Sequence, residues 1–344
     1  MTKIRCSINL GAVMAVKDTY EAIIIGAGPA GLAAGLYCQR AALKTVLFEK
    51  GLLGGQIAIS KDVENYPGVE GITGFDLAEK LVAHARAFGL NIVQQEVEAV
   101  VAGPDFHSVR LAGGDVFNTE ALILAVGGSV RKLGVPGEAE YLGSGVSYCG
   151  TCDGFFFRGK SVVVVGGGDT AVEEALYLSR LAGKVRLVHR GSALRAGKLL
   201  QSRLLAEPGT EIVWNTIITE IKGDGRTVEA VSFENVITGE KGELETDGVF
   251  IFIGYSPNNQ LIPPVVGVNE LGFVITDEKC QTSVPGIFAA GDLRQKFVNQ
   301  IVVAAADGCI AALAAAYYVE TRDRRRKTLD KTRIGEGANR RIGE

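Results

Sequence analysis

The fold of this chain is decided by the stretch from Tyr20 to Gly31, which reads YEAIIIGAGPAG. An apolar, β-branched run leads into a glycine loop of the form GxGxxG, and a helix-like segment, Leu32 to Ala42, follows. A second apolar run, Thr45 to Phe48, then ends at Glu49. This order of strand, glycine loop, helix and strand is typical of a dinucleotide-binding unit, in which the helix N-terminus faces the ligand's pyrophosphate.

The same arrangement occurs again from Ser161 to Ala171, SVVVVGGGDTA, and its second strand, Val185 to Val188, ends at His189. In both units 21 residues separate the second glycine of the loop from the residue that ends the second strand. The first glycine makes the tight turn, the second admits the ligand, and the third small residue lets helix and strand pack closely. These positions are Gly26, Gly28 and Gly31 in the first unit and Gly166, Gly168 and Ala171 in the second. The sequence therefore predicts two dinucleotide sites.

The ends of the second strands distinguish the two ligands. Glu49 is placed to accept hydrogen bonds from an unphosphorylated ribose diol. His189 and Arg190, together with Arg195, suit a ribose that carries a 2′-phosphate. Ordinary surface charge near a strand end is the alternative interpretation of the arginines.

Between the two glycine loops lies a CxxC pair, Cys149 and Cys152, followed by Asp153. A single CxxC without a second Cys or His pair does not supply the four ligands of a structural zinc site. A redox-active dithiol fits better, because a following helix N-terminus lowers a thiol's pKa and favours the attacking thiolate. Asp153 could carry the proton that the exchange requires, or it could cap the helix, and the two roles are compatible.

Composition limits the classes of protein further. The 344 residues, 47% of them hydrophobic and 22% charged, suggest about two compact domains. The tail from Thr321 holds nine basic and four acidic residues, which leaves 27 basic against 35 acidic residues before it and argues against nucleic-acid binding. Asp307 interrupts the longest apolar stretch, so the sequence predicts no membrane span. The six cysteines are scattered except for the CxxC pair and do not form an extracellular disulfide framework, which favours a cytoplasmic location.

Taken together, the ordered motifs resemble the low-molecular-weight thioredoxin reductases, a class of flavin-dependent pyridine nucleotide-disulfide oxidoreductases. The resemblance runs from about Tyr20 to Glu320 and also includes VENYPG from Val63, GYSPN from Gly254 and TSVPGIFAAGD from Thr282. It implies an α/β fold of two Rossmann-like dinucleotide-binding domains, with the nicotinamide domain inserted into the FAD domain. The expected parts are an N-terminal extension (1–17), the FAD domain (18–131 and 258–320), the NAD(P)H domain with its CxxC (132–257) and a flexible basic tail (321–344).

The resemblance also implies site residues. One noncovalent FAD per subunit would be bound by Gly26, Gly28, Pro29, Ala30, Gly31, Glu49, Gly55, Gln56, Asn65, Gly127, Asp292, Gln300 and Ile301. NADPH would be bound by Gly166, Gly168, Asp169, Thr170, Ala171, His189, Arg190 and Arg195. No metal is expected.

By the same resemblance, hydride passes from NADPH to FAD, and electrons then pass through the Cys149–Cys152 disulfide to thioredoxin. Cys152 would lie nearest the flavin, Cys149 would attack the partner's disulfide, and Asp153 would be the acid–base residue. The family forms homodimers and rotates its nicotinamide domain about two crossovers, expected here near 131–134 and 255–259.

Gly191 stands where the family has a second arginine, which weakens the expected preference for NADPH and leaves NADH as an alternative donor. Two further alternatives stay open at the level of the sequence. They are a flavin-dependent disulfide reductase with a different protein partner and a flavin-bound redox sensor that does not turn over.

Overall fold

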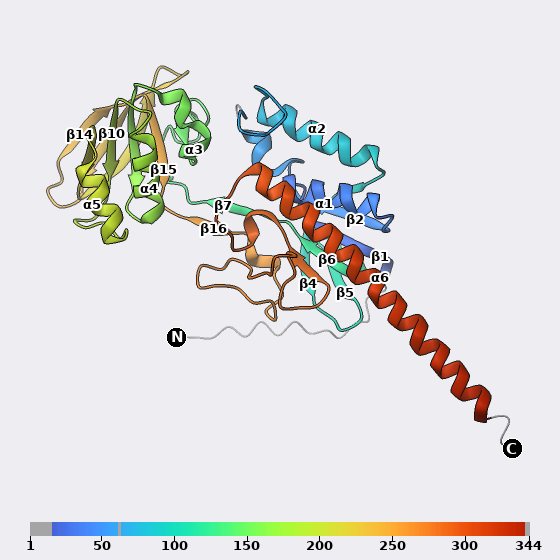
Figure 1. Cartoon of the computed structure of the whole chain (residues 1–344). Coiled ribbons are helices and arrows are strands. Elements are labelled where there is room, and N and C mark those ends of the chain that lie inside the picture. The colour runs from blue at the N-terminus through green and yellow to red at the C-terminus, as the bar shows by residue number, and fades with distance from the viewer. Residues whose placement is uncertain (1–15, 61–62, 341–344) are drawn as a thin grey trace. The chain divides into compact units, whose positions relative to one another are not determined.

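The structure, a computed structural model, describes residues 16–60 and 63–340, with side chains described as far as Arg324. The chain forms two compact units, each built on its own sheet (Figure 1). The first unit contains the chain up to Ala58, then Ala78–Gly127 and the chain from Asn258 onward; the second contains Ile59–Leu77 and Gly128–Pro257. The expected α/β fold, with one dinucleotide-binding part inserted into the other, is confirmed. Of the expected extension 1–17, residues 1–15 lie outside the described residues.

The first unit contains a seven-stranded sheet in the order β3-β2-β1-β6-β5-β4, with β17 also paired to β6. The strands are β1 (Val16–Ile25), β2 (Thr45–Glu49), β3 (Asn91–Gln94), β4 (Val97–Val101), β5 (His107–Leu111), β6 (Val116–Leu124) and β17 (Ile287–Ala289). Strands β1, β2, β3, β6 and β17 pair in parallel, whereas β4 and β5 are antiparallel. Strand β2 ends at Glu49, as the sequence predicts.

Strand β1 is buried on both faces of this sheet, which explains why its end is an unbroken apolar run. Ile24 belongs to the core cluster that contains residues of the helices, and Ile23 and Ile25 belong to the cluster on the other face. The alternation follows from the two-residue period of a strand. Both faces of the sheet are therefore closed to water at the strand that leads into the first glycine loop.

Three helices belong wholly or partly to the first unit: α1 (Pro29–Arg40), α2 (Gly74–Ala87) and α6 (Ile301–Arg340). Helices α1 and α6 lie against each other (Figure 1). A Cβ added at Gly308 of α6 would lie 2.0 Å from the carbonyl oxygen of Ala30, so the contact requires glycine. The short 3₁₀ turns are η1 (Gly55–Ile59), η3 (Asn259–Leu261) and η4 (Gly291–Leu293).

Helix α6 differs from the sequence-based expectation in two ways. It continues to Arg340, where the sequence suggested a flexible tail, because Arg, Lys and Leu are good helix formers. Its part Ile301–Arg324 is also long and apolar enough to cross a membrane by length and composition, although one such helix is weak evidence. Ala311, Ala312 and Ala315 are fully buried against the core of the first unit, as in the core helix of a globular domain.

The second unit contains a five-stranded parallel sheet in the order β11-β10-β9-β15-β8 and a three-stranded antiparallel sheet, β12-β13-β14. The first consists of β8 (Val146–Ser147), β9 (Ser161–Gly166), β10 (Lys184–Val188), β11 (Thr210–Val213) and β15 (Gly248–Phe252). The second consists of β12 (Thr216–Gly223), β13 (Val228–Asn235) and β14 (Lys241–Glu245). The helices are α3 (Gly150–Asp153), α4 (Asp169–Leu178) and α5 (Lys198–Ala206), and the turn η2 (Gly154–Phe157) follows α3.

The two crossovers between the units pair with each other. Strand β7 (Gly128–Val130) and strand β16 (Tyr255–Pro257) form a two-stranded antiparallel ribbon. Two of the unit borders fall at Gly127 and Pro257, beside the crossovers that the sequence analysis proposed as hinges. Rotation about them stays a prediction.

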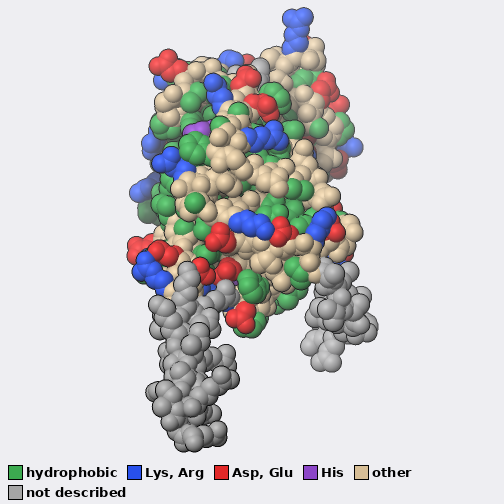
Figure 2. All heavy atoms as spheres, turned by 90° about the vertical axis from the view of Figure 1, so that its right-hand side faces the viewer, with side chains coloured by type: hydrophobic (Ala, Val, Ile, Leu, Met, Phe, Trp, Pro, Cys, Tyr) green, Lys and Arg blue, Asp and Glu red, His purple; other side chains and the backbone are tan. Residues whose placement is uncertain are grey.

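Charged side chains of both signs are interspersed over the face of the molecule that Figure 2 shows. Pairs such as Lys44 Nζ with Asp18 Oδ1, 2.7 Å apart, are largely exposed. Such pairs contribute only about 0.2–1 kcal/mol each to stability. The fold therefore depends on its cores rather than on surface ion pairs.

Candidate active site

The first glycine loop has the geometry that its residues predict. A Cβ added at Gly31 would lie 1.8 Å from the carbonyl oxygen of Gly26, so only glycine lets α1 pack this closely on β1. A Cβ at Gly28 would meet nothing within 4 Å, and α1 begins after Gly28 with no side-chain cap. The first backbone N–H groups of the helix are therefore not capped by a side chain and can bind an anion.

Glu49 lies at the end of β2, beside this loop. Its Oε2 accepts a hydrogen bond from the Ala27 N–H at 2.7 Å, and its Oε1 accepts one from the Gly51 N–H at 2.7 Å. Both bonds fix the carboxylate beside the loop, where a ribose diol can reach it. Gly55, at φ +62°, lies close to Gly28. A Cβ added at Gly55 would lie 3.1 Å from the Gly28 Cα.

The turn η4 and the start of α6 pack beside α1. A Cβ at Gly291 would lie 2.9 Å from the Ala30 Cβ, so Asp292 follows a backbone in close contact with α1. The Ala304 N–H donates to the Gln300 carbonyl at 2.9 Å, and α6 begins at Ile301. Gln300 thus directly precedes the first residue of α6. The structure thus groups these residues with Pro29 and Ala30 in the first unit.

A buried ion cluster that the sequence analysis missed supports this turn. Asp307 Oδ1 lies 2.7 Å from Arg294 Nη1, and its Oδ2 lies 3.3 Å from Lys296 Nζ. The same Lys296 Nζ lies 3.1 Å from Asp292 Oδ1, and the Gly291 N–H donates to Asp307 Oδ2 at 3.2 Å. The sign in the sequence that could have indicated this cluster is Asp307, a charged residue within an otherwise apolar stretch.

The remaining residues expected at the flavin are on loops. Gly127, at φ +63°, accepts a hydrogen bond through its carbonyl from the Asn258 N–H at 3.0 Å, and the Asn258 side chain donates to the Val126 carbonyl. Asn258 was not assigned a role, although it ends the quoted GYSPN motif. Gln56 is exposed on η1, and Asn65 is exposed in the second unit. Their contacts with a flavin stay predictions.

The uncapped helix N-terminus beside Gly28, the carboxylate of Glu49 and the close packing around Gly26 and Gly31 fit the adenosine diphosphate part of FAD.

The second glycine loop repeats this geometry. Helix α4 begins after Gly168 with no side-chain cap, and a Cβ at Gly168 would meet nothing within 4 Å. A Cβ at Gly166 would lie 2.5 Å from the Ala171 Cβ, which explains the need for small residues at both positions. Asp169 and Thr170 form the first turn of α4. The loop therefore offers a second anion-binding helix N-terminus.

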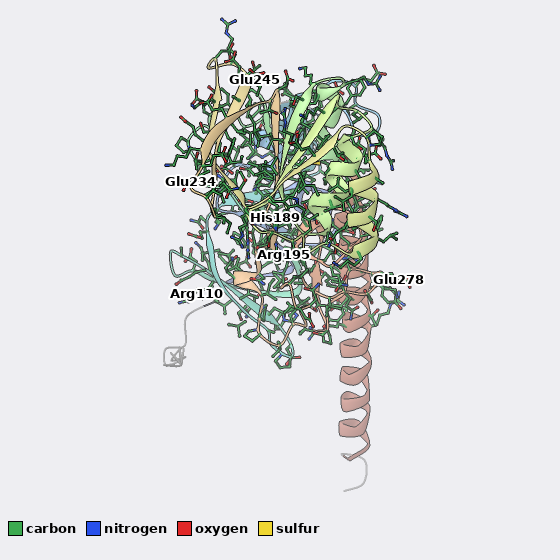
Figure 3. All side chains as sticks on the ribbon, turned by 90° about the vertical axis from the view of Figure 1, so that its left-hand side faces the viewer. Arg110, His189, Arg195, Glu234, Glu245 and Glu278 are labelled. Atoms are coloured by element: carbon green, nitrogen blue, oxygen red, sulfur yellow. A yellow bond between two sulfur atoms is a disulfide. The ribbon has the colours of Figure 1, made fainter. Side chains whose placement is uncertain are left out.

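The segment that carries the arginines is fixed to this loop. The Arg195 N–H donates to the Gly167 carbonyl at 2.7 Å, and the Gly197 N–H donates to Asp169 Oδ1 at 2.7 Å. His189 is buried, with Nδ1 2.9 Å from the Gly166 carbonyl oxygen and Nε2 3.1 Å from that of Ala193. His189 thus supports the segment from inside. The side chains of Arg190 and Arg195 are exposed. Figure 3 labels Arg195 together with the buried His189.

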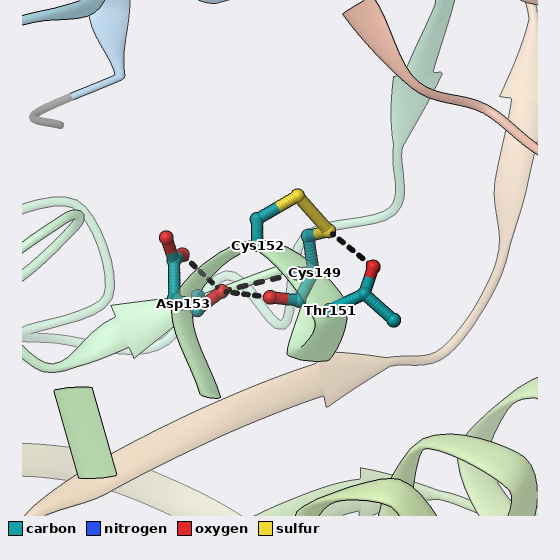
Figure 4. Close-up of a disulfide and its surroundings, with 5 residues drawn as sticks. Cys149, Thr151, Cys152 and Asp153 are labelled. Atoms are coloured by element: carbon teal, nitrogen blue, oxygen red, sulfur yellow. Dashed lines mark hydrogen bonds between the residues drawn. A yellow bond between two sulfur atoms is a disulfide. The ribbon is translucent and has the colours of Figure 1, made fainter. Parts of the chain in front are cut away.

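The CxxC pair forms a disulfide at the start of α3, with the Cys149 and Cys152 Cα atoms 5.3 Å apart (Figure 4). Cys149 is half-buried and Cys152 is exposed. Asp153 ends α3, and its Oδ2 accepts a hydrogen bond of 2.6 Å from the Ser147 hydroxyl. The Cys149 Sγ lies 3.4 Å from the Thr151 Oγ1. A disulfide, a carboxylate and an exposed cysteine therefore share one turn of chain.

The other described cysteines do not share this environment. Cys38 and Cys280 are buried, and burial raises the pKa of their thiols to about 12 and about 11. Such thiols remain protonated at neutral pH and do not act as nucleophiles. Cys309 is half-buried and unpaired. Cys38 and Cys280 are therefore packed thiols.

Comparisons with known proteins agree with this geometry. The family model described as "Pyridine nucleotide-disulphide oxidoreductase" matches residues 20–308. The thioredoxin reductase of Bacillus subtilis (strain 168) is 45% identical over 316 residues, which cover 92% of this chain and 100% of that protein.

Solved structures agree as well. The crystal structure of thioredoxin reductase from Streptococcus pyogenes MGAS5005 has a TM-score of 0.85 at 41% identity, covering 88% of this chain and 99% of that one. The crystal structure of Lactococcus lactis thioredoxin reductase (FR conformation) has a TM-score of 0.60 at 41% identity, covering 88% of this chain and 99% of that one. The chain belongs to the pyridine nucleotide-disulphide oxidoreductases and, among them, to the flavin-dependent thioredoxin reductases.

Proposed function

We propose that this protein is an NADPH-dependent thioredoxin reductase. The observation that carries the proposal is the Cys149–Cys152 disulfide on α3, beside Asp153, in a chain that also holds two uncapped glycine-loop helices. A sensor or binding module would not need two dinucleotide loops together with a disulfide. The flavin and the pyridine nucleotide, when bound, supply the two electrons that open the disulfide.

The protein's own residues perform the exchange with thioredoxin. The Cys149 thiolate attacks one sulfur of the thioredoxin disulfide and forms a mixed disulfide, while the leaving sulfur takes a proton from Asp153. Cys152 then gives its proton to the Asp153 carboxylate and attacks the Cys149 sulfur, and Asp153 passes this proton to the second thioredoxin sulfur, which leaves as a thiol. The Cys149–Cys152 dithiol is oxidised, the thioredoxin disulfide is reduced, and two protons leave with the product.

The second unit binds the coenzyme in this proposal, and the segment with Arg190 and Arg195 binds its 2′-phosphate. Two cations and the fixed Arg195 backbone support NADPH as donor. Gly191 carries no side chain, so NADH remains the second candidate donor. The residue sets expected for FAD and NADPH, a homodimer, a cytoplasmic location and rotation at the crossovers belong to the same proposal.

Anaerobic titration tests the proposal directly. The purified protein is titrated with NADPH and separately with NADH, and oxidised thioredoxin is then added. We expect bleaching of the flavin absorbance by NADPH and its return on addition of thioredoxin, with steady turnover under excess NADPH. A protein that is reduced by NADPH but does not pass electrons to thioredoxin would contradict the proposed partner. One that takes electrons only from NADH would contradict the proposed donor.

A further inference from the structure

The hydroxyl of Ser147 is at the centre of the hydrogen bonds around the disulfide. Ser147 ends the edge strand β8, is 3% exposed, and pairs with Phe250 of β15. Its Oγ lies 2.6 Å from Asp153 Oδ2, 3.0 Å from the Cys149 backbone nitrogen and 3.2 Å from the Cys149 carbonyl oxygen. Dashed lines in Figure 4 mark these hydrogen bonds.

A serine hydroxyl has one proton to donate and two lone pairs that accept. One lone pair accepts the Cys149 N–H in every state. When Asp153 is ionised, the hydroxyl donates to its carboxylate, and the 2.6 Å distance is typical of a charge-assisted O–H···O⁻ bond.

When Asp153 holds a proton, the bond reverses. The carboxyl O–H then donates to the second lone pair of Ser147, and the Ser147 hydroxyl rotates toward the Cys149 carbonyl. That carbonyl also accepts the Asp153 N–H at 3.2 Å, and a carbonyl oxygen has two lone pairs for these two donors. Both protonation states of Asp153 are therefore hydrogen-bonded without movement of the backbone.

We propose that Ser147 is a positioning residue for the acid–base step, one that holds Asp153 beside the disulfide and follows its proton. The inference rests on the proposed function of Asp153 as the proton donor to the leaving thiol. Ser147 touches neither sulfur in the reaction, so its effect is exerted through Asp153. Because its hydroxyl stabilises the ionised carboxylate, it sets the pH range over which Asp153 can supply a proton.

Other groups that titrate also face α3 and must be separated from this effect. Glu174 of α4 lies against Gly150, where a Cβ would come within 2.1 Å of its Oε2, and burial raises its pKa. Tyr177 of α4 contacts Gly154. On the strand side, the Tyr148 hydroxyl donates to Glu138 Oε1 at 2.8 Å, and burial raises the pKa of Tyr148. Glu174→Gln is therefore the control for a second carboxyl near the disulfide.

Two substitutions of equal shape isolate the hydroxyl. Ser147→Thr keeps the hydroxyl, whereas Ser147→Val has nearly the same volume and the same preference for a strand but no hydroxyl. Ser147→Ala removes the group without adding a methyl to the buried site. Asp153→Asn gives the behaviour expected when the acid–base residue itself is lost.

The experiment measures the rate of dithiol–disulfide exchange by stopped flow. Each holoenzyme is reduced with NADPH and mixed with oxidised thioredoxin, and separately with a chromogenic aromatic disulfide, from about pH 4 to about pH 9. The rate of flavin reduction by NADPH is recorded for every variant. If the wild type reduces only the chromogenic disulfide, the proposed partner is wrong, and the Ser147 series is still evaluated with that oxidant.

In the wild type we expect the exchange rate to fall as the pH rises through the range in which Asp153 loses its proton. In Ser147→Val and Ser147→Ala this fall should move upward by about one pH unit, because the hydroxyl binds the ionised carboxylate more strongly than the protonated one, and this difference changes the ionisation equilibrium by about tenfold. Ser147→Thr and Glu174→Gln should keep the wild-type position, and Asp153→Asn should lose this feature of the profile. Flavin reduction should be unchanged in the Ser147 variants and in Glu174→Gln.

The proposal is overturned if Ser147→Val matches Ser147→Thr at every pH. It is also overturned if the valine variant is slower by a constant factor with its pH profile in place, since that result indicates a purely structural role.

Discussion

The coenzyme preference of the second unit can be changed at one residue, Gly191. Its backbone is not in the left-handed region, and an added Cβ would lie 3.1 Å from His189 Nε2 and 3.8 Å from the Ala193 carbonyl oxygen. A side chain therefore fits after a shift of a few tenths of an ångström. Gly191→Arg places a third cation on the segment that carries Arg190 and Arg195.

The magnitude follows from the exposure of these arginines. A hydrogen bond to a charged group contributes about 1.5–3 kcal/mol, and an exposed ion pair about 0.2–1 kcal/mol. For a partly solvated phosphate contact we take about 1.4 kcal/mol, which is about tenfold in affinity. Two arginines then support a preference for NADPH on the order of a hundredfold, and a third raises it by up to about tenfold.

The assay compares kcat/KM for NADPH and NADH with thioredoxin as acceptor. Arg190→Ala and Arg195→Ala should each lower the ratio by about tenfold, chiefly through the KM for NADPH, because the 2′-phosphate is remote from the reacting carbon. Arg203→Ala, an exposed arginine on α5, is the matched control and should leave the ratio unchanged. Equal efficiency with NADH in the wild type, or no effect of either arginine substitution, would refute the assignment of this segment to the phosphate.

Three further predictions concern the flavin, the disulfide and stability. Glu49→Gln should weaken FAD binding by about tenfold in a fluorescence titration of the apoprotein, because an amide accepts the ribose hydrogen bonds less strongly than a carboxylate; unchanged affinity would contradict the role of Glu49. Cys149→Ser and Cys152→Ser should each abolish thioredoxin reduction while flavin reduction by NADPH persists, and turnover in either variant would show that the disulfide is only structural. Burial lowers the pKa of His107, so the unfolded chain takes up the proton first. Stability should therefore be complete above about pH 6.5 and be lost as the pH falls below it. The midpoint of urea unfolding should show this loss, and His107→Gln should reduce it; an unchanged pH dependence would exclude His107 as its source.

The sequence predicted those parts of the fold in which a single position allows only one kind of residue. Gly31 must be glycine because of the Gly26 carbonyl, and Glu49 must end its strand beside the loop, so local order in the chain was enough to find the first site.

The partners of Asp307 and the convergence of hydrogen bonds on Ser147 could not be predicted. The ion cluster joins side chains from a turn and a helix, and its members are ordinary polar residues in the sequence. Ser147 is one serine before a CxxC motif, and only the fold shows that its hydroxyl reaches Asp153. Such contacts depend on side-chain rotamers and on the path of the backbone. The hydrophobic periodicity of the sequence predicts neither of these.

The pairing of β17 with β6 has a consequence for biosynthesis. Ile287 lies beside Leu122, although 165 residues of chain separate them, and the core around Ile24 is completed by Ala311, Ala312 and Ala315 of α6. On the ribosome, β1 and the first glycine loop emerge early but remain without these partners until almost the whole chain has been made. The parallel sheet of the second unit, from Val146 to Phe252, is continuous in the sequence and has emerged by then. The inserted unit can therefore fold during translation while the outer one waits for its last helix, so a ribosome that stalls before Ile301 leaves an exposed, flavin-free first unit beside a finished second one.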